Sequence, residues 1–155
     1  MNLDKEIPFE TIEGYQYLVS FREFPTEQNK YKIPLVDISI TLMSNNVENN
    51  TLKTLHQFVE IIAEYLKKNN VIIYYYCDTS PIKIRFNRAS KFTPQEFRFN
   101  LFSKMFNDKK LNDYYLQEII IKDIEKGNHY ISLISNIKNR QKVELVKLEI
   151  ENFNK

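Results

Sequence analysis

Cysteine is almost absent from this sequence of 155 residues, which contains only Cys77. A single cysteine excludes an intramolecular disulfide framework and a zinc site built from several thiolates. The longest strongly apolar run, residues 71–77, is far shorter than the ~20 residues that a membrane-spanning helix needs. The first ten residues are acidic and polar, unlike a secretory signal. We therefore expect a cytoplasmic protein that binds no metal, no cofactor and no membrane.

Glycine and tryptophan are also scarce, with two glycines, Gly14 and Gly127, and no tryptophan. The loop that follows residues 71–77 contains no glycine and carries Asp78, which argues against a phosphate-binding cradle. What the chain does contain is typical of a globular protein, with 43% hydrophobic and 27% charged residues. Because no internal repeat or flexible linker is present, we expect one domain that spans residues 1–155.

The first third of the chain shows the alternation that is typical of β-strands. Apolar side chains recur at every second residue in 15–21 and again in 36–42, which predicts two half-buried strands. Gly14 stands where a turn would separate the first of these strands from a shorter apolar run at 9–12. Pro25 then ends the strand, since proline cannot donate to a central ladder. We expect a three-stranded meander.

A helix is predicted after the polar break at 45–50, because apolar residues continue at helical spacing from Leu52 to Leu66. The asparagine pair at 69–70 ends this helix. The run 71–77 that follows is apolar without alternation. Such a run is typical of a central strand that is buried on both faces.

Residues 78–92 allow two interpretations. Ser80-Pro81 is typical of a helix start, whereas the alternation of Ile82, Ile84 and Phe86 with polar residues is typical of a strand. We favour the helix. A second helix is predicted over 94–106, because the sequence from residue 93 to residue 96 matches a capping box with proline at the first helical position.

The last third predicts a hairpin and a terminal helix. Two β-branched and aromatic runs within 114–137 flank the turn-forming residues 125–128. From residue 139 onward, apolar residues fall on one helical face. The resulting order βββ-α-β-α(α)-ββ-α predicts an α+β fold with a mixed, largely antiparallel sheet on which the helices pack.

The residues that commonly carry catalysis show no assembled set. His56 lies at the margin of the apolar stripe of its predicted helix, and His129 opens the last strand. Neither has a partner at metal-ligand spacing on a shared face. Cys77 ends the buried strand with no neighbouring base, so we interpret it as a small buried hydrophobe. A small enzyme that uses Cys77 and Asp78 remains an alternative, and we assign no catalytic residue.

Positive charge is concentrated in the middle of the chain. Residues 81–110 carry eight bases and two acids, whereas residues 1–50 carry four bases and eight acids. Lysine supplies 17 of the 22 bases, yet three of the five arginines fall within 14 residues of one another. Six of the eleven phenylalanines are interleaved with these cations. The candidate residues for binding a partner or nucleic acid are Lys83, Arg85, Arg88, Lys91, Arg98 and Lys104.

Arg98 is the most unusual of these cations. In the predicted helix 94–106 it falls in the middle of the apolar arc, while Ser103 and Lys104 lie on the polar side. A cation in that position is paired beneath the surface, extends its charge to solvent, or belongs to a site. A purely structural reading stays open, because phenylalanines at helical spacing commonly form core and the basic middle could offset the acidic start.

Two short stretches resemble an uncharacterised family of small bacterial proteins, known as a domain of unknown function. One is the strand end at 76–80 with Arg85, Arg88 and the pair 91–92, and the other is the stretch 127–134 before the charged terminal helix. The resemblance covers residues 36–153. It implies a standalone intracellular domain, and it supplies no activity, cofactor or catalytic residue.

Two hypotheses from different classes follow. The first is a non-catalytic interaction module, for example an accessory or antitoxin-like component of a bacterial operon, whose segment 81–106 binds an acidic protein partner. The second is a protein that binds RNA or single-stranded DNA, with or without nuclease activity, since cations contact phosphates while aromatic rings stack on bases. The oligomeric state and the order of the strands in the sheet stay open.

Overall fold

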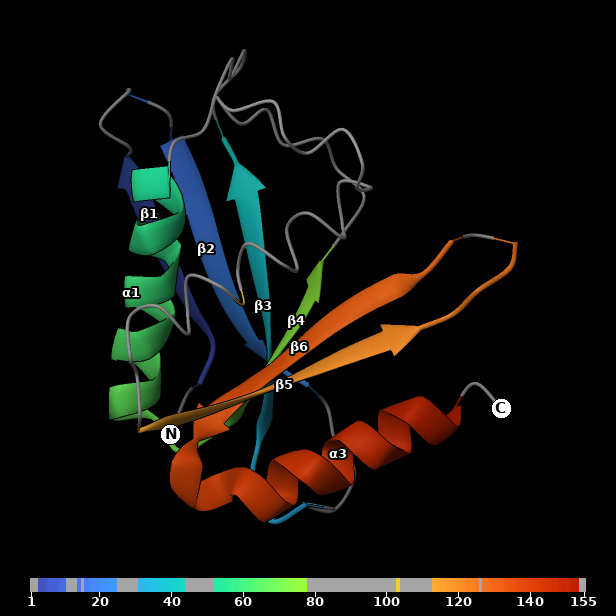
Figure 1. Ribbon diagram of the computed structural model, residues 1–155. Helices are drawn as coiled ribbons and strands as arrows, with labels where there is room; N and C mark the ends of the chain where they lie inside the picture. Colours follow the sequence, from blue (N-terminus) through green and yellow to red (C-terminus); the bar gives the residue numbers. More distant parts are fainter. Residues whose placement is uncertain are drawn as a thin grey trace.

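The computed structural model of the chain (Figure 1) describes residues 3–10, 14, 16–24, 31–43, 52–77, 103, 113–125 and 127–153. The strands within these ranges form one six-stranded sheet. In spatial order they are β1 (Lys5–Glu10), β2 (Gln16–Glu23), β3 (Leu35–Leu42), β4 (Ile72–Cys77), β6 (His129–Asn136) and β5 (Tyr114–Ile121). Neighbours pair antiparallel except β3 and β4, which pair parallel. The mixed, largely antiparallel sheet of an α+β fold is thereby confirmed.

The two long helices cover opposite faces of the sheet. Helix α1 (Leu52–Lys68) connects the parallel strands β3 and β4, and α3 (Arg140–Phe153) follows β6 through the short 3₁₀ helix η3 (Ile137–Asn139). On β4, Ile73 belongs to the core beneath α1, while its neighbour Ile72 belongs to the core beneath α3. Because adjacent strand residues point to opposite faces, one strand separates the two cores. Figure 1 shows α1 beside β1 and β2, and α3 alongside β5.

The core beneath α1 is built around stacked aromatic rings. The rings of Phe21 and Tyr65 lie 3.9 Å apart, centroid to centroid, and are nearly parallel. The Tyr65 hydroxyl donates a hydrogen bond of 2.7 Å to the Leu3 carbonyl, and burial together with nearby Asp4 and Glu23 raises the Tyr65 pKa to about 12. The helix is therefore joined to the start of the chain by packing and by a hydrogen bond.

A buried hydrogen-bond network attaches the start of α3 to the start of β4. The Asn139 side-chain amide donates to Ser135 Oγ at 3.0 Å and to Asn70 Oδ1 at 2.8 Å. Ser135 Oγ in turn donates to the Val71 carbonyl at 2.6 Å. Buried polar groups are costly when unpaired, so this network defines where η3 passes into α3. Beyond it, Val143 and Val146 pack on the sheet.

Several elements lie where the sequence predicts them. Helix α1, the central strand β4, the hairpin of β5 and β6, and the terminal helix α3 are all confirmed. Strand β1 begins earlier than the apolar run at 9–12, because Ile7 and Phe9 already alternate with exposed residues from Lys5 onward. Gly14 has a positive φ of 89° between β1 and β2, as the expected turn requires.

The helices predicted over 81–92 and 94–106 lie outside the described residues, apart from Ser103. Ser103 is helical, but it is buried, whereas its position on the predicted arc places it on the polar side. Tertiary packing can cover a side chain that helical periodicity alone places outside the apolar arc. Of the helices that the structure describes, none is long and apolar enough to cross a membrane.

The stacked pair in the first core allows a direct test of this packing. Phe21 is completely buried, so Phe21→Ala removes a ring and leaves a cavity against Tyr65, and we expect a loss of about 3–5 kcal/mol in the free energy of unfolding. Leu145→Ala on the exposed side of α3 is the control, with an expected change within about 0.5 kcal/mol. Urea denaturation measures both, and equal losses in the two variants would contradict the assigned core.

Candidate functional site

The six cations selected from the sequence lie outside the described residues. Lys83, Arg85, Arg88, Lys91, Arg98 and Lys104 all fall between residues 78 and 112, where only Ser103 is described. What the structure does place is the point from which this basic segment departs. Strand β4 ends at Cys77, four residues before the segment begins.

The end of β4, the end of β5 and the start of β6 lie at the same end of the sheet. In the strand pairing, Cys77 at the end of β4 lies opposite Tyr130, and Ile121 at the end of β5 lies opposite His129 at the start of β6. The chain therefore enters the basic segment at the same end of the sheet as the turn of the β5–β6 hairpin (Figure 1). Side chains from β4, β6 and the turn can meet there.

Tyr76, His129 and Asp123 form a chain of hydrogen bonds at this end. The Tyr76 hydroxyl oxygen lies 2.6 Å from His129 Nδ1, and His129 Nε2 lies 3.2 Å from Asp123 Oδ2. An ionised carboxylate only accepts hydrogen bonds, so in the neutral imidazole Nε2 carries the proton and Nδ1 accepts from the phenol. The imidazole is thus oriented by Asp123 and aligned with the tyrosine hydroxyl.

The hairpin turn holds Asp123 in position for this contact. Its Oδ1 accepts a hydrogen bond of 2.9 Å from the Glu125 backbone N–H, and its carbonyl accepts one of 3.0 Å from the Gly127 N–H. Gly127 has a φ of 84°, a value that glycine adopts without the steric cost of a side chain. The turn therefore occupies one carboxylate oxygen and leaves the other for His129.

His129 opens β6, as the sequence predicts, and the structure adds two hydrogen-bond partners that the sequence did not indicate. His129 is a strand residue with Asp123 six positions before it and Tyr76 on a neighbouring strand. The turn signal at 125–128 predicted the hairpin, but only the strand register shows which carboxylate faces the ring. In the part of the chain that the structure describes, no group of three or more His, Cys, Asp or Glu side chains could hold a metal ion.

The Tyr76 phenol is accessible at the surface and is polarised by its hydrogen bond to His129. About a third of the Tyr76 side chain is exposed, so its ring is accessible while its hydroxyl is held by His129. A phenol in contact with an imidazole–carboxylate pair is able to exchange a proton with a bound group, since the imidazole accepts the proton and the carboxylate stabilises the resulting cation. The same contact also restricts the rotation of the ring, which favours binding by lowering its entropic cost.

Tyr74 and Asp37 occupy the same face of the sheet beside this chain. They lie opposite each other in the parallel pairing of β3 and β4. Burial, followed by the charge of Asp37 and the neighbouring Tyr76, raises the pKa of Tyr74 to about 12, so its hydroxyl stays protonated. Burial also raises the pKa of Asp37 above its usual value.

The pKa shift of Asp37 has a consequence for stability. A carboxyl group whose pKa is higher in the folded state favours folding when protonated, and this contribution is lost as the pH rises through the folded-state pKa. We therefore expect Asp37→Asn, which keeps the group neutral, to raise the free energy of unfolding at pH 7 and to change it little below pH ~3. Urea denaturation at both pH values tests this, and stabilisation that is equal at both would contradict it.

The comparisons with known proteins assign no family to this fold and site. The chain matches no protein-family model, no curated protein sequence and no solved structure. The arguments about function below therefore depend on the residues themselves.

Proposed function

We propose that this protein is an interaction module that binds an acidic protein partner at the end of the sheet where β4 leads into the basic segment 81–106. The observation that carries the proposal is the position of Tyr76. Its ring is partly exposed, its hydroxyl is held by His129, and it lies one residue before the end of β4, the last described strand before the concentration of cations in the sequence. A fixed aromatic side chain that is followed along the sequence by several arginines supplies the residue types that are enriched at the energetic centres of protein interfaces.

Two physical effects support an acidic partner. Residues 81–110 carry six more bases than acids, and such a local excess attracts and orients an anionic surface. Three of the cations are arginines, whose planar guanidinium groups bind carboxylates through two parallel hydrogen bonds. Tyr76 contributes apolar area at the edge of this charge, and its restricted rotation lowers the entropy lost on binding.

The test compares charge reversal in the basic segment with charge reversal elsewhere. The triple variant Arg85→Glu, Arg88→Glu, Arg98→Glu changes the net charge by six, and so does the control Lys67→Glu, Lys68→Glu, Lys138→Glu, which alters exposed lysines of α1 and η3. Binding of a fluorescent polyglutamate peptide is measured by anisotropy. We expect the arginine variant to bind at least about tenfold more weakly, a change of about 1.4 kcal/mol, and the control to bind like the unaltered protein.

A single-stranded oligonucleotide with the same number of charges distinguishes the partner class. Phosphate contacts release counterions, so nucleic-acid binding weakens steeply between 50 and 200 mM salt. Binding of the oligonucleotide that is tighter than binding of polyglutamate and lost steeply with salt would replace the acidic protein by RNA or single-stranded DNA. Equal peptide binding by both triple variants would overturn the proposal.

The Tyr76–His129–Asp123 chain favours a second candidate, the cleavage of bound RNA. In this reaction the 2′-hydroxyl loses its proton towards the phenol and imidazole, its oxygen forms a bond to phosphorus, and the bond from phosphorus to the 5′-oxygen breaks. The 5′-oxygen then receives the proton, so the products are a 2′,3′-cyclic phosphate and a free 5′-hydroxyl. The hydrogen-bonded phenol and imidazole supply the proton transfers that this step requires.

Loss of one hydroxyl group tests the second candidate. We expect Tyr76→Phe to lower the rate of formation of the 2′,3′-cyclic phosphate from single-stranded RNA by about 100-fold or more. Tyr115→Phe is a matched control, because its hydroxyl donates to Glu144 on α3 at 2.9 Å, away from the site. Equal rates in the two variants, or no cyclic product from the unaltered protein, would eliminate RNA cleavage at this site.

A further inference from the structure

The two edges of the sheet differ in how they are protected. Strand β1 contains Pro8, and its exposed positions include Lys5 and Glu6. Proline and charged residues are common means by which proteins prevent other chains from pairing with an edge. Strand β5, at the other edge, contains no proline, and it pairs with β6 without interruption from Tyr114 to Ile121.

The pairing with β6 defines which backbone groups of β5 point outward. The Ile137 N–H donates to the Asp113 carbonyl at 2.8 Å, so Asp113 and Ile137 form a hydrogen-bonded pair. Such pairs alternate along an antiparallel ladder. The odd-numbered residues of β5 therefore bond to β6, and the N–H and C=O groups of Leu116, Glu118 and Ile120 are directed away from β6, where no described strand pairs with them.

The side chains along this edge are self-complementary. Residues 116–124 read Leu-Gln-Glu-Ile-Ile-Ile-Lys-Asp-Ile, a sequence whose chemical character is nearly the same in both directions about Ile120. If the segment pairs antiparallel with itself at Ile120, Glu118 lies opposite Lys122. The same register sets Leu116 opposite Ile124. Every one of these pairs joins even-numbered residues, whose backbone groups within β5 are the ones directed outward.

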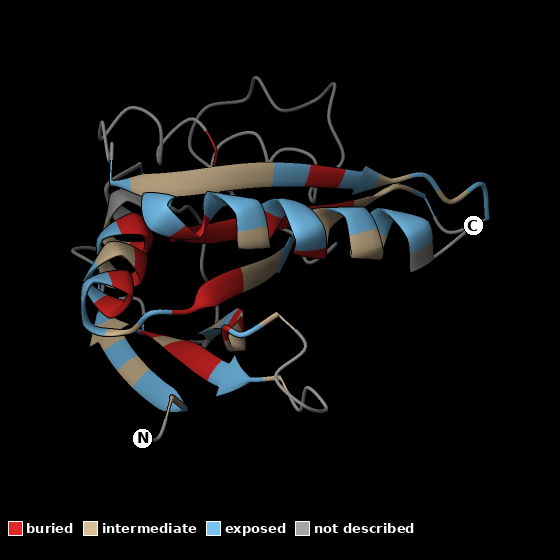
Figure 2. Ribbon diagram, turned by 90° about the horizontal axis from the view of Figure 1, so that it is seen from below, coloured by how far each residue is buried: buried red, intermediate tan, exposed pale blue. Residues whose placement is uncertain are grey.

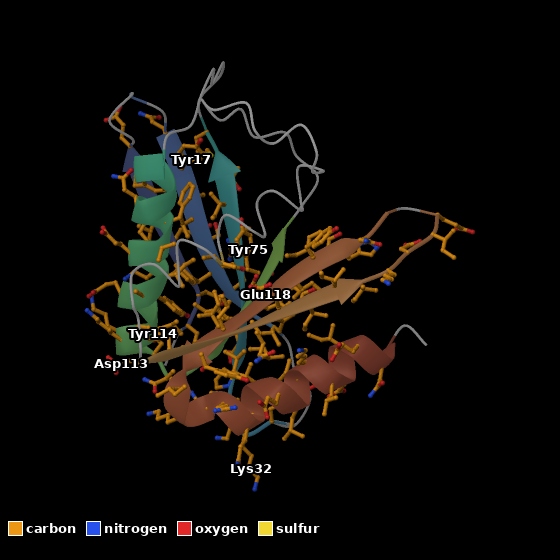
Figure 3. The ribbon with its side chains drawn as sticks, in the orientation of Figure 1. Tyr17, Lys32, Tyr75, Asp113, Tyr114 and Glu118 are labelled. Atoms are coloured by element: carbon orange, nitrogen blue, oxygen red, sulfur yellow. The ribbon has the colours of Figure 1, made fainter. Side chains whose placement is uncertain are left out.

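These side chains are also accessible. Ile120 is 51% exposed, although it lies in a strand, and Ile124 in the turn is fully exposed. Glu118 and Lys122, which directly follows the strand, are exposed as well. Figure 3 shows Glu118 on β5, and Figure 2 shows exposed residues along this strand and along the outer side of α3. Among the described strands, β5 pairs with β6 alone, and an exposed isoleucine flanked by opposite charges on such an edge is suited to pairing with another strand.

We propose that β5 pairs with β5 of a second copy of this chain around a two-fold axis at Ile120. The interface is isologous, so it closes at two copies and joins the two sheets into one. The outward N–H and C=O groups of Ile120 bond to their equivalents, and the Glu118–Lys122 ion pair forms twice. A shift of one residue sets Glu118 opposite Ile121 in one direction and opposite Asp123 in the other, so either shift loses the ion pair and charge defines the register.

Charge exchange tests the register of this dimer. Glu118→Lys places two lysines opposite each other at both ends of the interface, and Lys122→Glu places two glutamates there. We expect each variant to raise the dissociation constant of the dimer at least about tenfold, since like charges directly opposite each other are destabilising. The double variant Glu118→Lys, Lys122→Glu restores both pairs, and we expect its dissociation constant to return to within about threefold of the original.

Sedimentation equilibrium measures these constants, with Glu151→Lys on an exposed position of α3 as the control for a change of charge. A fourth variant, Ile120→Pro, removes the outward N–H while leaving the hydrogen bonds to β6 in place. We expect it to be monomeric and to retain the unfolding transition of the unaltered protein. A monomeric unaltered chain at ~100 µM, or a double variant that dissociates as readily as the single variants, would overturn the proposal.

Discussion

The burial of β4 is the constraint on which the rest of this structure depends. Val71, Ile72 and Ile73 are almost completely inaccessible, because α1 covers one face of the strand and α3 covers the other. A strand that is apolar on both faces is stable only in the centre of a sheet with both faces covered. This position joins the two antiparallel halves of the sheet, and it directs the end of β4, with Tyr76, towards the start of β6.

The local elements could be predicted from the sequence because each depends on neighbouring residues. Alternation predicts β2 and β3, helical spacing predicts α1, and the turn-forming residues before His129 predict the hairpin. The parallel pairing of β3 with β4 depends on contacts across the whole of α1, which no local pattern shows. For the same reason the sequence did not predict the contact between Tyr76 and His129, which are 53 residues apart. The basic segment was selected from its charge, its clustered arginines and its interleaved phenylalanines, and its candidate residues lie outside the described ranges.

The proposed recognition site and the proposed dimer edge use the same hairpin through different residues. Alternation along the strands sets Tyr76 and His129 on the face that α3 covers in part, together with Ile72 and Leu133. It sets Glu118 and Ile120 on the opposite face, to which Tyr114 and Leu116 also belong. Because the two sets of side chains point in opposite directions, a substitution in one set leaves the other unchanged. Binding of a partner and self-association can therefore be separated experimentally, and dimerisation would present two recognition sites at once.

The central claim is that recognition occurs at the end of the sheet formed by Tyr76, His129 and the hairpin turn. The most direct measurement is an NMR titration of the ¹⁵N-labelled protein with the polyglutamate peptide, in which backbone amide shifts locate the binding surface. The account predicts changes in the amides of Tyr76, Asp123 and His129, with little change in β1 and β2. Changes confined to β1 and β2, with the amides of Tyr76 and His129 unaffected, would contradict it.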